Sequence, residues 1–190
     1  MTPGKPHLII ISGPPGAGKS TLARPLAQRL QLPLFEKDVI KENFADALGD
    51  HSSGLSRPLG RAAIAQLFAI THELLRVGQG LVIESSLHRG LAEKDLAPLL
   101  PLAEATLVHV RADDAVLLSR FERRMEDPDR HPIHHDGNQL GDLRHYLAEG
   151  LTDPLDLDIR QIIIDTTYGP IDPEEVAFMV QDAFEDDDEG

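Results

Sequence analysis

Several short stretches of the chain are mostly apolar, and longer stretches between them repeat apolar residues every three or four positions. A continuous apolar run of about four to eight residues is typical of a strand buried on both faces, as in a parallel sheet. The run Leu8–Ile11, which ends shortly before Gly13, is the clearest example. We therefore expect strands at 7–12, 34–36, 80–84, 106–111 and 161–165.

The longer stretches have the spacing of helices that bury one face. Leu22, Leu26 and Leu30, for example, recur every four residues. Asp172 followed by Pro173 is a typical helix start, with the cap residue and then proline at the first helical position. Helices are expected at 19–30, 39–48, 60–77, 92–102 (interrupted near Pro98), 113–125 (capped by Asp113), 140–150 and 173–184. Two stretches rich in Gly, Pro, Ser, His and Asp, at 50–58 and 127–142, are expected to be loops.

Strands that alternate with helices predict an α/β fold, with a parallel sheet covered by helices on both faces. The length of 190 residues favours a single domain over 1–190. The chain has no cysteine, which excludes disulfides and thiolate metal sites. Its apolar runs are far shorter than the roughly 18–20 residues of a membrane span, and no signal peptide is evident, so we expect a cytoplasmic protein.

The formal net charge is −14, from 18 basic and 32 acidic residues. A protein of this charge repels phosphate backbones, so binding to nucleic acids or membrane surfaces is disfavoured. The acidic tail, residues 185–190, is expected to be a frayed, solvated end.

The strongest motif is a glycine-rich segment directly after the first expected strand, Gly13-Pro14-Pro15-Gly16-Ala17-Gly18-Lys19-Ser20. It satisfies the phosphate-loop pattern, and its place between a strand and a helix is the context that this pattern requires. Such a loop surrounds phosphates with backbone N–H groups, and the helix that follows adds its positive end. Lys19 is expected to reach the β- and γ-phosphates, and the Ser20 hydroxyl to bind Mg²⁺. The expected nucleotide-binding residues are Gly13, Pro15, Gly16, Ala17, Gly18, Lys19, Ser20 and Thr21.

The same loop serves GTPases, transport ATPases and small kinases, so the motif alone does not set the reaction. The chain has neither the Asn-Lys-x-Asp motif of GTPases nor the Leu-Ser-Gly-Gly motif of transporters. It is also too short for a large ring ATPase. These absences favour a kinase that acts on small acceptors.

The chain resembles the family of small phosphate-loop kinases, which includes polynucleotide 5′-kinases, chloramphenicol phosphotransferase, gluconate and shikimate kinases and zeta-toxin kinases. It looks closest to the "predicted kinase" branch of AAA-domain proteins. The resemblance rests on Gly13–Ser20, on 35–41 (FEKDVIK), on 82–84 (VIE) and on 120–124 (RFERR). It implies a phosphate-loop NTPase fold, with a five-stranded parallel sheet flanked by helices and a helical lid at about 116–145. It also implies ATP and Mg²⁺ as cofactors.

In that family an aspartate at the position of Asp38 faces the acceptor hydroxyl and acts as its base. A carboxylate within about 3 Å of a hydroxyl can orient it and accept its proton during transfer. Asp38 could instead cap the helix expected at Val39, and the two roles are compatible. Lys41, one turn later, is interpreted either as a contact to the acceptor or a phosphate, or as a solvated helix lysine.

Glu84 ends the third expected strand, where an acid beside the phosphate loop can hold Mg²⁺ through water. Its alternative role is that of an ordinary loop carboxylate. By the resemblance, Arg120 and Arg124 belong to the lid and stabilise charge on the transferred phosphoryl group, and Arg120 also contacts the nucleotide. The alternative for these arginines is surface ion pairing with the acids around them, Glu122, Glu126, Asp127 and Asp129.

Two further segments have less specific signals. The segment 130–135 (RHPIHH) holds three histidines, and both a metal site and a polar lid segment near the acceptor are conceivable. The lack of cysteine and of a paired strand favours the polar segment. The segment 165–167 (DTT) either flanks the adenine, as in related kinases, or is a plain turn.

Together these signals predict an ATP- and Mg²⁺-dependent kinase that phosphorylates a hydroxyl of a small molecule such as a sugar, nucleoside or antibiotic. Segments 50–61 and 85–91 and the lid are expected to build the acceptor pocket. A kinase for nucleic-acid 5′-hydroxyls and a nucleotide-binding switch or ATPase without an acceptor are the alternatives. The protein is expected to be a monomer or homodimer.

Overall fold

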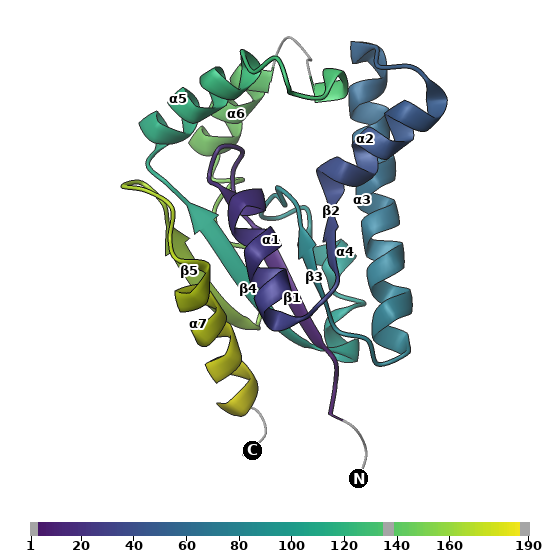
Figure 1. Cartoon of the computed structure of the whole chain (residues 1–190), viewed down its shortest axis with the longest axis vertical. Helices are drawn as coiled ribbons and strands as arrows, with labels where there is room; N and C mark the ends of the chain where they lie inside the picture. The colour runs from purple at the N-terminus through teal and green to yellow at the C-terminus, as the bar shows by residue number, and fades with distance from the viewer. Residues whose placement is uncertain (1–3, 135–138, 187–190) are drawn as a thin grey trace.

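The computed structural model describes residues 4–134 and 139–186. Within them, five strands form one parallel sheet in the order β2-β3-β1-β4-β5 (Figure 1). The fold class predicted from the sequence is therefore confirmed. The strands are β1 (His7–Ser12), β2 (Leu34–Glu36), β3 (Leu81–Glu84), β4 (Glu104–Arg111) and β5 (Arg160–Asp165).

The central strand β1 pairs with β3 on one side and with β4 on the other, so that Ile11 lies beside both Glu84 and Val108. This register brings the carboxyl ends of β1 and β3 together. In open parallel sheets, ligands bind at this carboxyl edge, at the point where the strand order along the chain reverses. The phosphate loop leaves β1 at this place.

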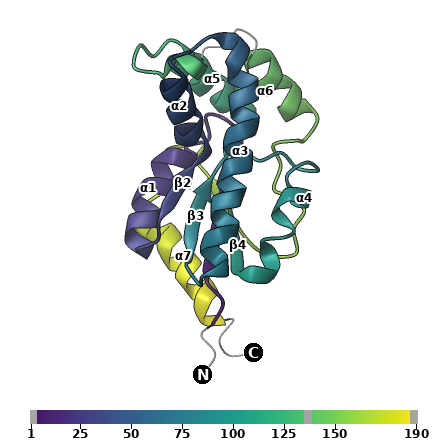
Figure 2. The same ribbon diagram turned by 90° about the vertical axis from the view of Figure 1, so that its right-hand side faces the viewer.

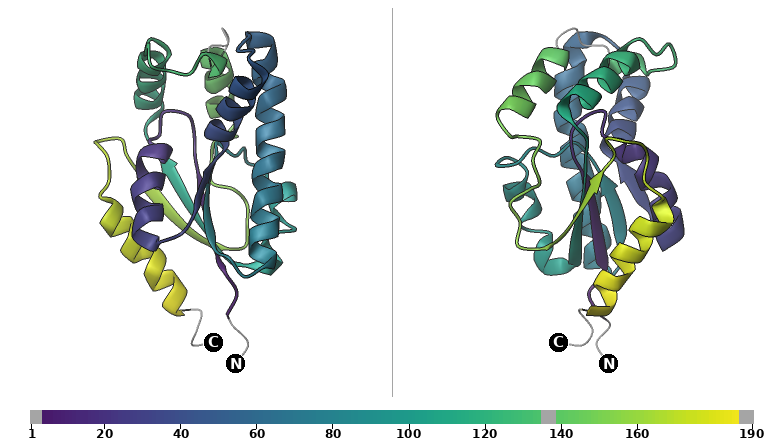
Figure 3. Two further views of the ribbon diagram at one scale, coloured as in Figure 1. Left: turned by 45° about the vertical axis from the view of Figure 1, so that its right-hand side comes forward. Right: turned by 90° about the vertical axis from the view of Figure 1, so that its left-hand side faces the viewer.

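Alternate residues of the strands enter two different cores, which explains why their sequences are apolar without interruption. Ile9 and Ile11 face α1 (Lys19–Leu30) and α7 (Pro173–Asp186). Leu8 and Ile10 face the opposite core, which includes residues of α3 (Ser53–Arg76) and α4 (Glu93–Leu96). Figure 2 shows the long helix α3 alongside the sheet, and Figure 3 shows α1 and α7 on the other face.

A third, smaller core lies beyond the carboxyl edge of the sheet. It joins Ala45 of α2 (Lys37–Leu48), Leu59 of α3 and Ile133 of the short 3₁₀ helix η2 (Pro132–His134). Ile133 is completely buried, and burial of such a side chain contributes roughly 2 kcal/mol. It therefore anchors the chain that follows α5 (Asp114–Met125) onto the α2–α3 pair. The helix α6 (Gln139–Ala148) completes the region predicted as the lid, opposite the end where β1 begins and α7 ends (Figure 1).

Two local predictions need correction. The loop expected at 50–58 is wrong, because α3 begins at Ser53. Leu55 and Leu59 pack in the third core, and this burial outweighs the turn-like composition of Gly54 and Pro58. The helix expected at 92–102 consists of α4 and a separate 3₁₀ helix, η1 (Leu100–Leu102).

Of the helix caps considered in the sequence analysis, one is confirmed by a side-chain hydrogen bond. Asp172 accepts a hydrogen bond from the Glu174 N–H at 2.9 Å, which confirms the predicted start of α7. Asp113 precedes α5 but makes no side-chain cap bond. Because α2 begins at Lys37 with Glu36 as its cap residue, the capping role considered for Asp38 is wrong.

Some predicted features lie partly or wholly outside the described residues. His135 is one of them, and so are residues 187–190 of the acidic tail. The start of that tail, 185–186, is the end of α7, which runs two residues beyond the predicted end at Phe184. No helix within the described residues is long and apolar enough to cross a membrane.

Candidate active site

The phosphate loop is held in shape by glycines where other residues would not fit. Gly13 has a φ of +136°, and a Cβ atom there would lie 1.9 Å from the Val110 carbonyl oxygen of β4. Gly16 has a φ of +86°, and its Cβ would meet the Leu117 carbonyl of α5 at 3.0 Å. The loop therefore packs against β4 and α5 at distances that only glycine allows.

Lys19 begins α1 and is buried at the bottom of this loop. Its Nζ atom donates a hydrogen bond to the Pro14 carbonyl oxygen at 2.9 Å, so the side chain curls back over the loop. Burial lowers the pKa of this amine, although the carboxylates of Glu84 and Asp38 oppose the shift. A desolvated ammonium group interacts strongly with an anion that comes into contact with it.

Ser20 and Glu84 are brought together by the pairing of β1 with β3. The Ser20 hydroxyl donates a hydrogen bond of 3.0 Å to a Glu84 carboxylate oxygen. Glu84 is buried, and burial raises the pKa of its carboxyl group, while Lys19 acts in the opposite direction. A hydroxyl and a carboxylate next to a phosphate loop are oxygen ligands of the kind that Mg²⁺ prefers, directly or through water. The arrangement therefore fits the predicted metal site.

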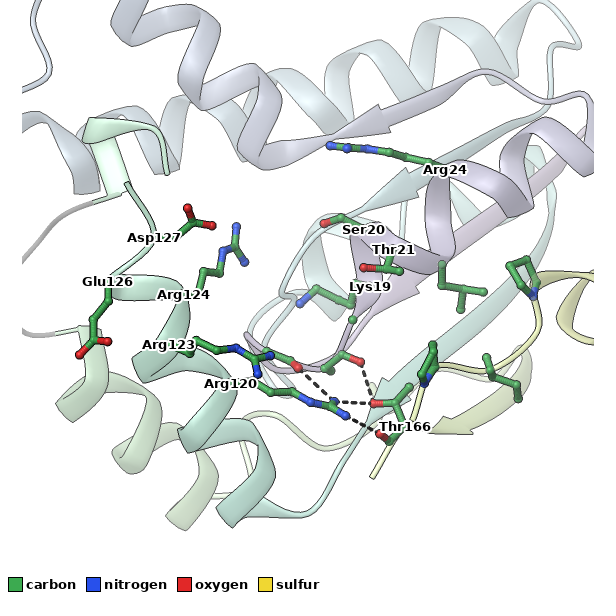
Figure 4. A pocket seen from close by; sticks show the side chains of 17 residues that line it. Lys19, Ser20, Thr21, Arg24, Arg120, Arg123, Arg124, Glu126, Asp127 and Thr166 are labelled. Atoms are coloured by element: carbon green, nitrogen blue, oxygen red, sulfur yellow. Dashed lines mark hydrogen bonds between the residues drawn. The ribbon is translucent and has the colours of Figure 1, made fainter. Parts of the chain in front are cut away.

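A pocket of about 1110 Å³ opens over the loop, between α1 and α5, and we call it the loop pocket. Its walls include Lys19, Ser20 and Thr21 on one side and three arginines of α5 on the other (Figure 4). Of the predicted nucleotide-binding residues, Gly16, Ala17 and Gly18 also line it, while Gly13 and Pro15 shape the loop outside its lining. The lining residues are Gly16–Leu22, Arg24, Arg120, Arg123, Arg124, Glu126, Asp127, Thr166, Pro170, Ile171 and Pro173.

Arg120 is fixed to the segment after β5. One of its terminal nitrogens donates to the Thr166 carbonyl oxygen at 2.7 Å, and the other donates to the Thr166 hydroxyl at 3.0 Å and to the Gly16 carbonyl at 3.4 Å. The buried Thr166 hydroxyl in turn donates to the Ala17 carbonyl at 2.9 Å. Thr166 therefore ties α5 to the phosphate loop, so the segment 165–167 is more than a plain turn.

The arginines Arg123 and Arg124 also line the loop pocket. Within the described ranges, no salt bridge joins Arg120, Arg123 or Arg124 to an acidic side chain, and Glu122 pairs with Arg144 at 3.7 Å instead. The alternative of surface ion pairs for Arg120 and Arg124 therefore lacks support here. The phosphate-binding role of these two residues stays a prediction.

Asp38 lies in the first turn of α2 and is half exposed. The adjacent Lys37 donates a short hydrogen bond to its carboxylate. Partial burial acts to raise the pKa of Asp38, but Lys37, His134 and Lys19 together hold that pKa well below its ordinary value. The carboxylate is thus kept charged at neutral pH.

Lys41 is buried, and its Nζ atom donates a hydrogen bond of 2.7 Å to the Ser56 hydroxyl of α3. Its interpretation as a solvated lysine is therefore wrong. The bond joins α2 to the part of α3 that the sequence predicted as a loop, so Lys41 helps to position the helix that carries Asp38.

A second pocket, of about 730 Å³, is lined in part by Lys37, the residue that bonds to Asp38, and we call it the side pocket. Its residues come from all three segments predicted to bind the acceptor. Lys37 contributes to its wall, and a salt bridge of 3.1 Å between Arg57 of α3 and Asp142 of α6 also lines it. The rings of His88 and Tyr146 pack against each other with centroids 4.5 Å apart. The lining residues are Lys37, Arg57, Gly60, Arg61, Ile64, Phe68, Ser85–Leu87, His88, Leu91, Ala92, Asp95, Asp142, His145 and Tyr146.

The sequence interpretation missed two contributions to these pockets. It did not identify Lys37 as the partner of Asp38, although the two are adjacent in the sequence. It also did not identify Tyr146, since an aromatic residue in an amphipathic helix has no signal that distinguishes a pocket from a core position.

Comparison with known proteins identifies a matching family and several relatives. The AAA domain family matches residues 8–149 of the chain. A shikimate kinase from Rhodococcus jostii is 61% identical over 36 residues, which is 19% of this chain and 21% of that protein. One from Pseudomonas fluorescens is 29% identical over 167 residues, covering 85% of this chain and 88% of that protein. The chain thus spans about a fifth of the first relative and most of the second.

The fold has solved counterparts. A crystal structure of a candidate kinase from Chloroflexus aurantiacus is 32% identical in sequence and superimposes with a TM-score of 0.84, covering 94% of this chain and 98% of that one. The two chains therefore share one fold over nearly their whole lengths.

Proposed function

Because this chain belongs to the AAA domain family and is one of the small phosphate-loop kinases, we propose that it transfers the γ-phosphoryl group of ATP to a hydroxyl of a small molecule. The relatives named as shikimate kinases support an alcohol as acceptor. Neither relative identifies the acceptor of this chain.

The observation that carries this proposal is that Asp38 interacts with one lining residue of each pocket. Its carboxylate bonds to Lys37, which lines the side pocket, and it lies within electrostatic reach of Lys19 in the loop pocket. A kinase needs a carboxylate at the boundary between donor and acceptor, within reach of the hydroxyl that attacks phosphorus. Asp38 is our candidate for this carboxylate.

In the proposed reaction, the phosphates of ATP lie on the phosphate loop, with Lys19 against the β- and γ-phosphates. Mg²⁺, held by Ser20 and, through water, by Glu84, would neutralise charge between the two phosphates. Arg120 and Arg124, with Arg123 beside them, would contact the transferred phosphoryl group from the opposite wall. Arg120 holds α5 against the loop through Thr166, so that these arginines face the phosphates.

The low pKa of Asp38 determines how it would act. A carboxylate that is hard to protonate is a weak base toward a free alcohol, but it remains a charged acceptor that can orient the hydroxyl. The transition state of phosphoryl transfer is loose, so the hydroxyl loses its proton late and orientation contributes most. We infer that Asp38 positions the acceptor oxygen in line with the γ-phosphorus and takes its proton as the new bond forms.

The side pocket would hold the acceptor. Its volume of about 730 Å³ falls in the range of pockets for small ligands, and its lining includes the apolar side chains of Ile64, Phe68 and Leu91. Its positively charged lining residues are Lys37, Arg57 and Arg61, and its negatively charged ones are Asp95 and Asp142. Such a lining suits a monosaccharide- or nucleoside-sized molecule that has both a polar edge and an apolar face.

The test is transfer of label from γ-labelled ATP, with Mg²⁺, into pooled acceptors: sugars, nucleosides, aminoglycoside and phenicol antibiotics, sugar nucleotides and 5′-hydroxyl oligonucleotides. The variant Lys19→Ala is the control for contaminating kinases. Label that enters one small acceptor with wild type, but not with Lys19→Ala, is expected. Label that appears only as free phosphate, even after the pool is widened to cell-extracted metabolites, would contradict the proposal.

A further inference from the structure

Three side chains with metal-binding atoms meet where the end of α2 approaches the lid. Asp46 belongs to α2, His51 to the turn after it, and His131 to the loop just before η2. The Asp46 Oδ1 atom lies 2.8 Å from His51 Nε2 and 3.1 Å from His131 Nε2. All three candidate ligand atoms lie within 4.8 Å of one another. Residues 46 and 131 are 85 positions apart, so only the fold brings them together.

The surrounding structure holds these ligands in place from both sides. After α2, Gly49 adopts a left-handed conformation with a φ of +65°, which turns the chain so that His51 returns to Asp46. On the other side, Ile133 is buried beneath Ala45 and fixes the loop two residues after His131. A site that is already assembled loses little entropy when it binds an ion.

The chemistry of the three groups points to a transition metal. Imidazole nitrogen and carboxylate oxygen are typical zinc ligands, and three protein ligands plus water complete a tetrahedral site. The side chains of Asp46 and His51 are 62% and 38% exposed, so water can reach the ion. Mg²⁺ prefers oxygen ligands, so it is expected at Ser20 and Glu84 rather than at this site.

We propose that Asp46, His51 and His131 form a binding site for Zn²⁺ that fastens the loop before η2 to α2. The ion would replace the two imidazole protons that now point to the same carboxylate oxygen. The site has no part in phosphoryl transfer, so it stands or falls independently of the proposed function.

One hydrogen bond gives the site a local reporter. The backbone N–H of Ile133 now donates to His131 Nδ1 at 3.2 Å, which places the ring proton on Nε2. A metal on Nε2 moves that proton to Nδ1, so this long contact must open. Metal binding is therefore expected to shift the amide resonance of Ile133.

The experiment is calorimetric titration of the full chain with Zn²⁺, in the presence of excess Mg²⁺ to occupy oxygen-ligand sites. One Zn²⁺ per chain is expected for wild type. The variants His51→Gln and His131→Gln should each weaken binding by about tenfold or more, since each removes one of three protein ligands. The control His72→Gln removes an exposed histidine that pairs with one carboxylate, Glu73, at 3.2 Å, and should leave binding unchanged.

Thermal unfolding without metal shows whether each variant is folded, and His51, which is on the surface, is the safer of the two. Three results would overturn the proposal. They are the absence of saturable Zn²⁺ binding, equal affinity of wild type and both variants, and loss of binding in Glu84→Gln but not in His51→Gln. An Ile133 amide resonance that stays in place at saturating Zn²⁺ would also contradict it.

Discussion

The buried histidine of β4 makes the stability of this protein depend on pH. His109 is only 2% exposed, and its Nδ1 atom has no hydrogen-bond partner among the described residues. Burial is the main cause that lowers its pKa from 6.5 to about 4, the positive charges of Lys19 and Arg111 add to the shift, and Asp153 opposes it. The folded protein therefore keeps this ring neutral under conditions in which the unfolded chain protonates it.

The sign and size of the effect follow from these two pKa values. Well above pH 6.5 neither state binds the proton, so His109 has almost no effect on the free energy of unfolding. As the pH falls from 6.5 toward 4, only the unfolded chain gains a proton, and the free energy of unfolding decreases. At pH 5, the loss relative to pH 8 is about 2 kcal/mol, since one pKa unit corresponds to about 1.4 kcal/mol.

The measurement is urea unfolding of wild type and His109→Gln at pH 8, 7, 6 and 5. Burial also lowers the pKa values of His88 and His134, so both proteins lose stability on acidification. The variant lacks only the contribution of His109, and its loss between pH 8 and pH 5 should be smaller by about 2 kcal/mol. An equal change in the free energy of unfolding with pH for the two proteins would refute the reasoning. The control His72→Gln, which replaces an exposed histidine, should show the same pH dependence as wild type.

Three further predictions concern the site. Gly13→Ala places a Cβ atom 1.9 Å from the Val110 carbonyl oxygen and should lower the free energy of unfolding by about 2 kcal/mol or more. The control Gly54→Ala adds a Cβ atom in open space and should not lower it. Equal melting temperatures of the two variants would contradict this prediction. Thr166→Val removes the hydrogen bonds of the hydroxyl to Arg120 and Ala17 and should raise KM for ATP about tenfold. The control Thr166→Ser keeps the hydroxyl and should have a KM close to that of wild type. An unchanged KM in Thr166→Val would show that this link is dispensable. Glu84→Gln should raise the Mg²⁺ concentration for half-maximal activity by about tenfold in a Mg²⁺ titration, while an unchanged requirement would remove Glu84 from the metal site.

Much of the fold could be predicted from the sequence because burial on both faces leaves a simple pattern. The strands around Ile9 and Val82 are apolar without interruption, and the glycines of the phosphate loop have a spacing that few other structures need. The start of α3 could not be predicted in this way. Its glycine and proline indicate a turn, and only the packing of Leu59 against Ala45 and Ile133 makes the segment helical.

The candidate site shows the same division. Lys19, Ser20 and Asp38 are located by two short motifs, 13–20 and 35–41, each of which is continuous in the sequence. The bracing of Arg120 by Thr166 and the meeting of Asp46 with His131 join residues that are 46 and 85 positions apart. Such contacts depend on the relative positions of whole elements, and a single sequence carries no periodic signal for them.

The central claim is that Asp38 orients the acceptor hydroxyl at the boundary of the two pockets. The most direct test is the rate of γ-phosphoryl transfer by Asp38→Asn at saturating ATP and acceptor, beside wild type. The account predicts that kcat falls about a hundredfold or more while KM for ATP stays nearly unchanged, because Asn keeps the shape but loses the charge that orients the hydroxyl. Transfer by Asp38→Asn at the wild-type rate would contradict it.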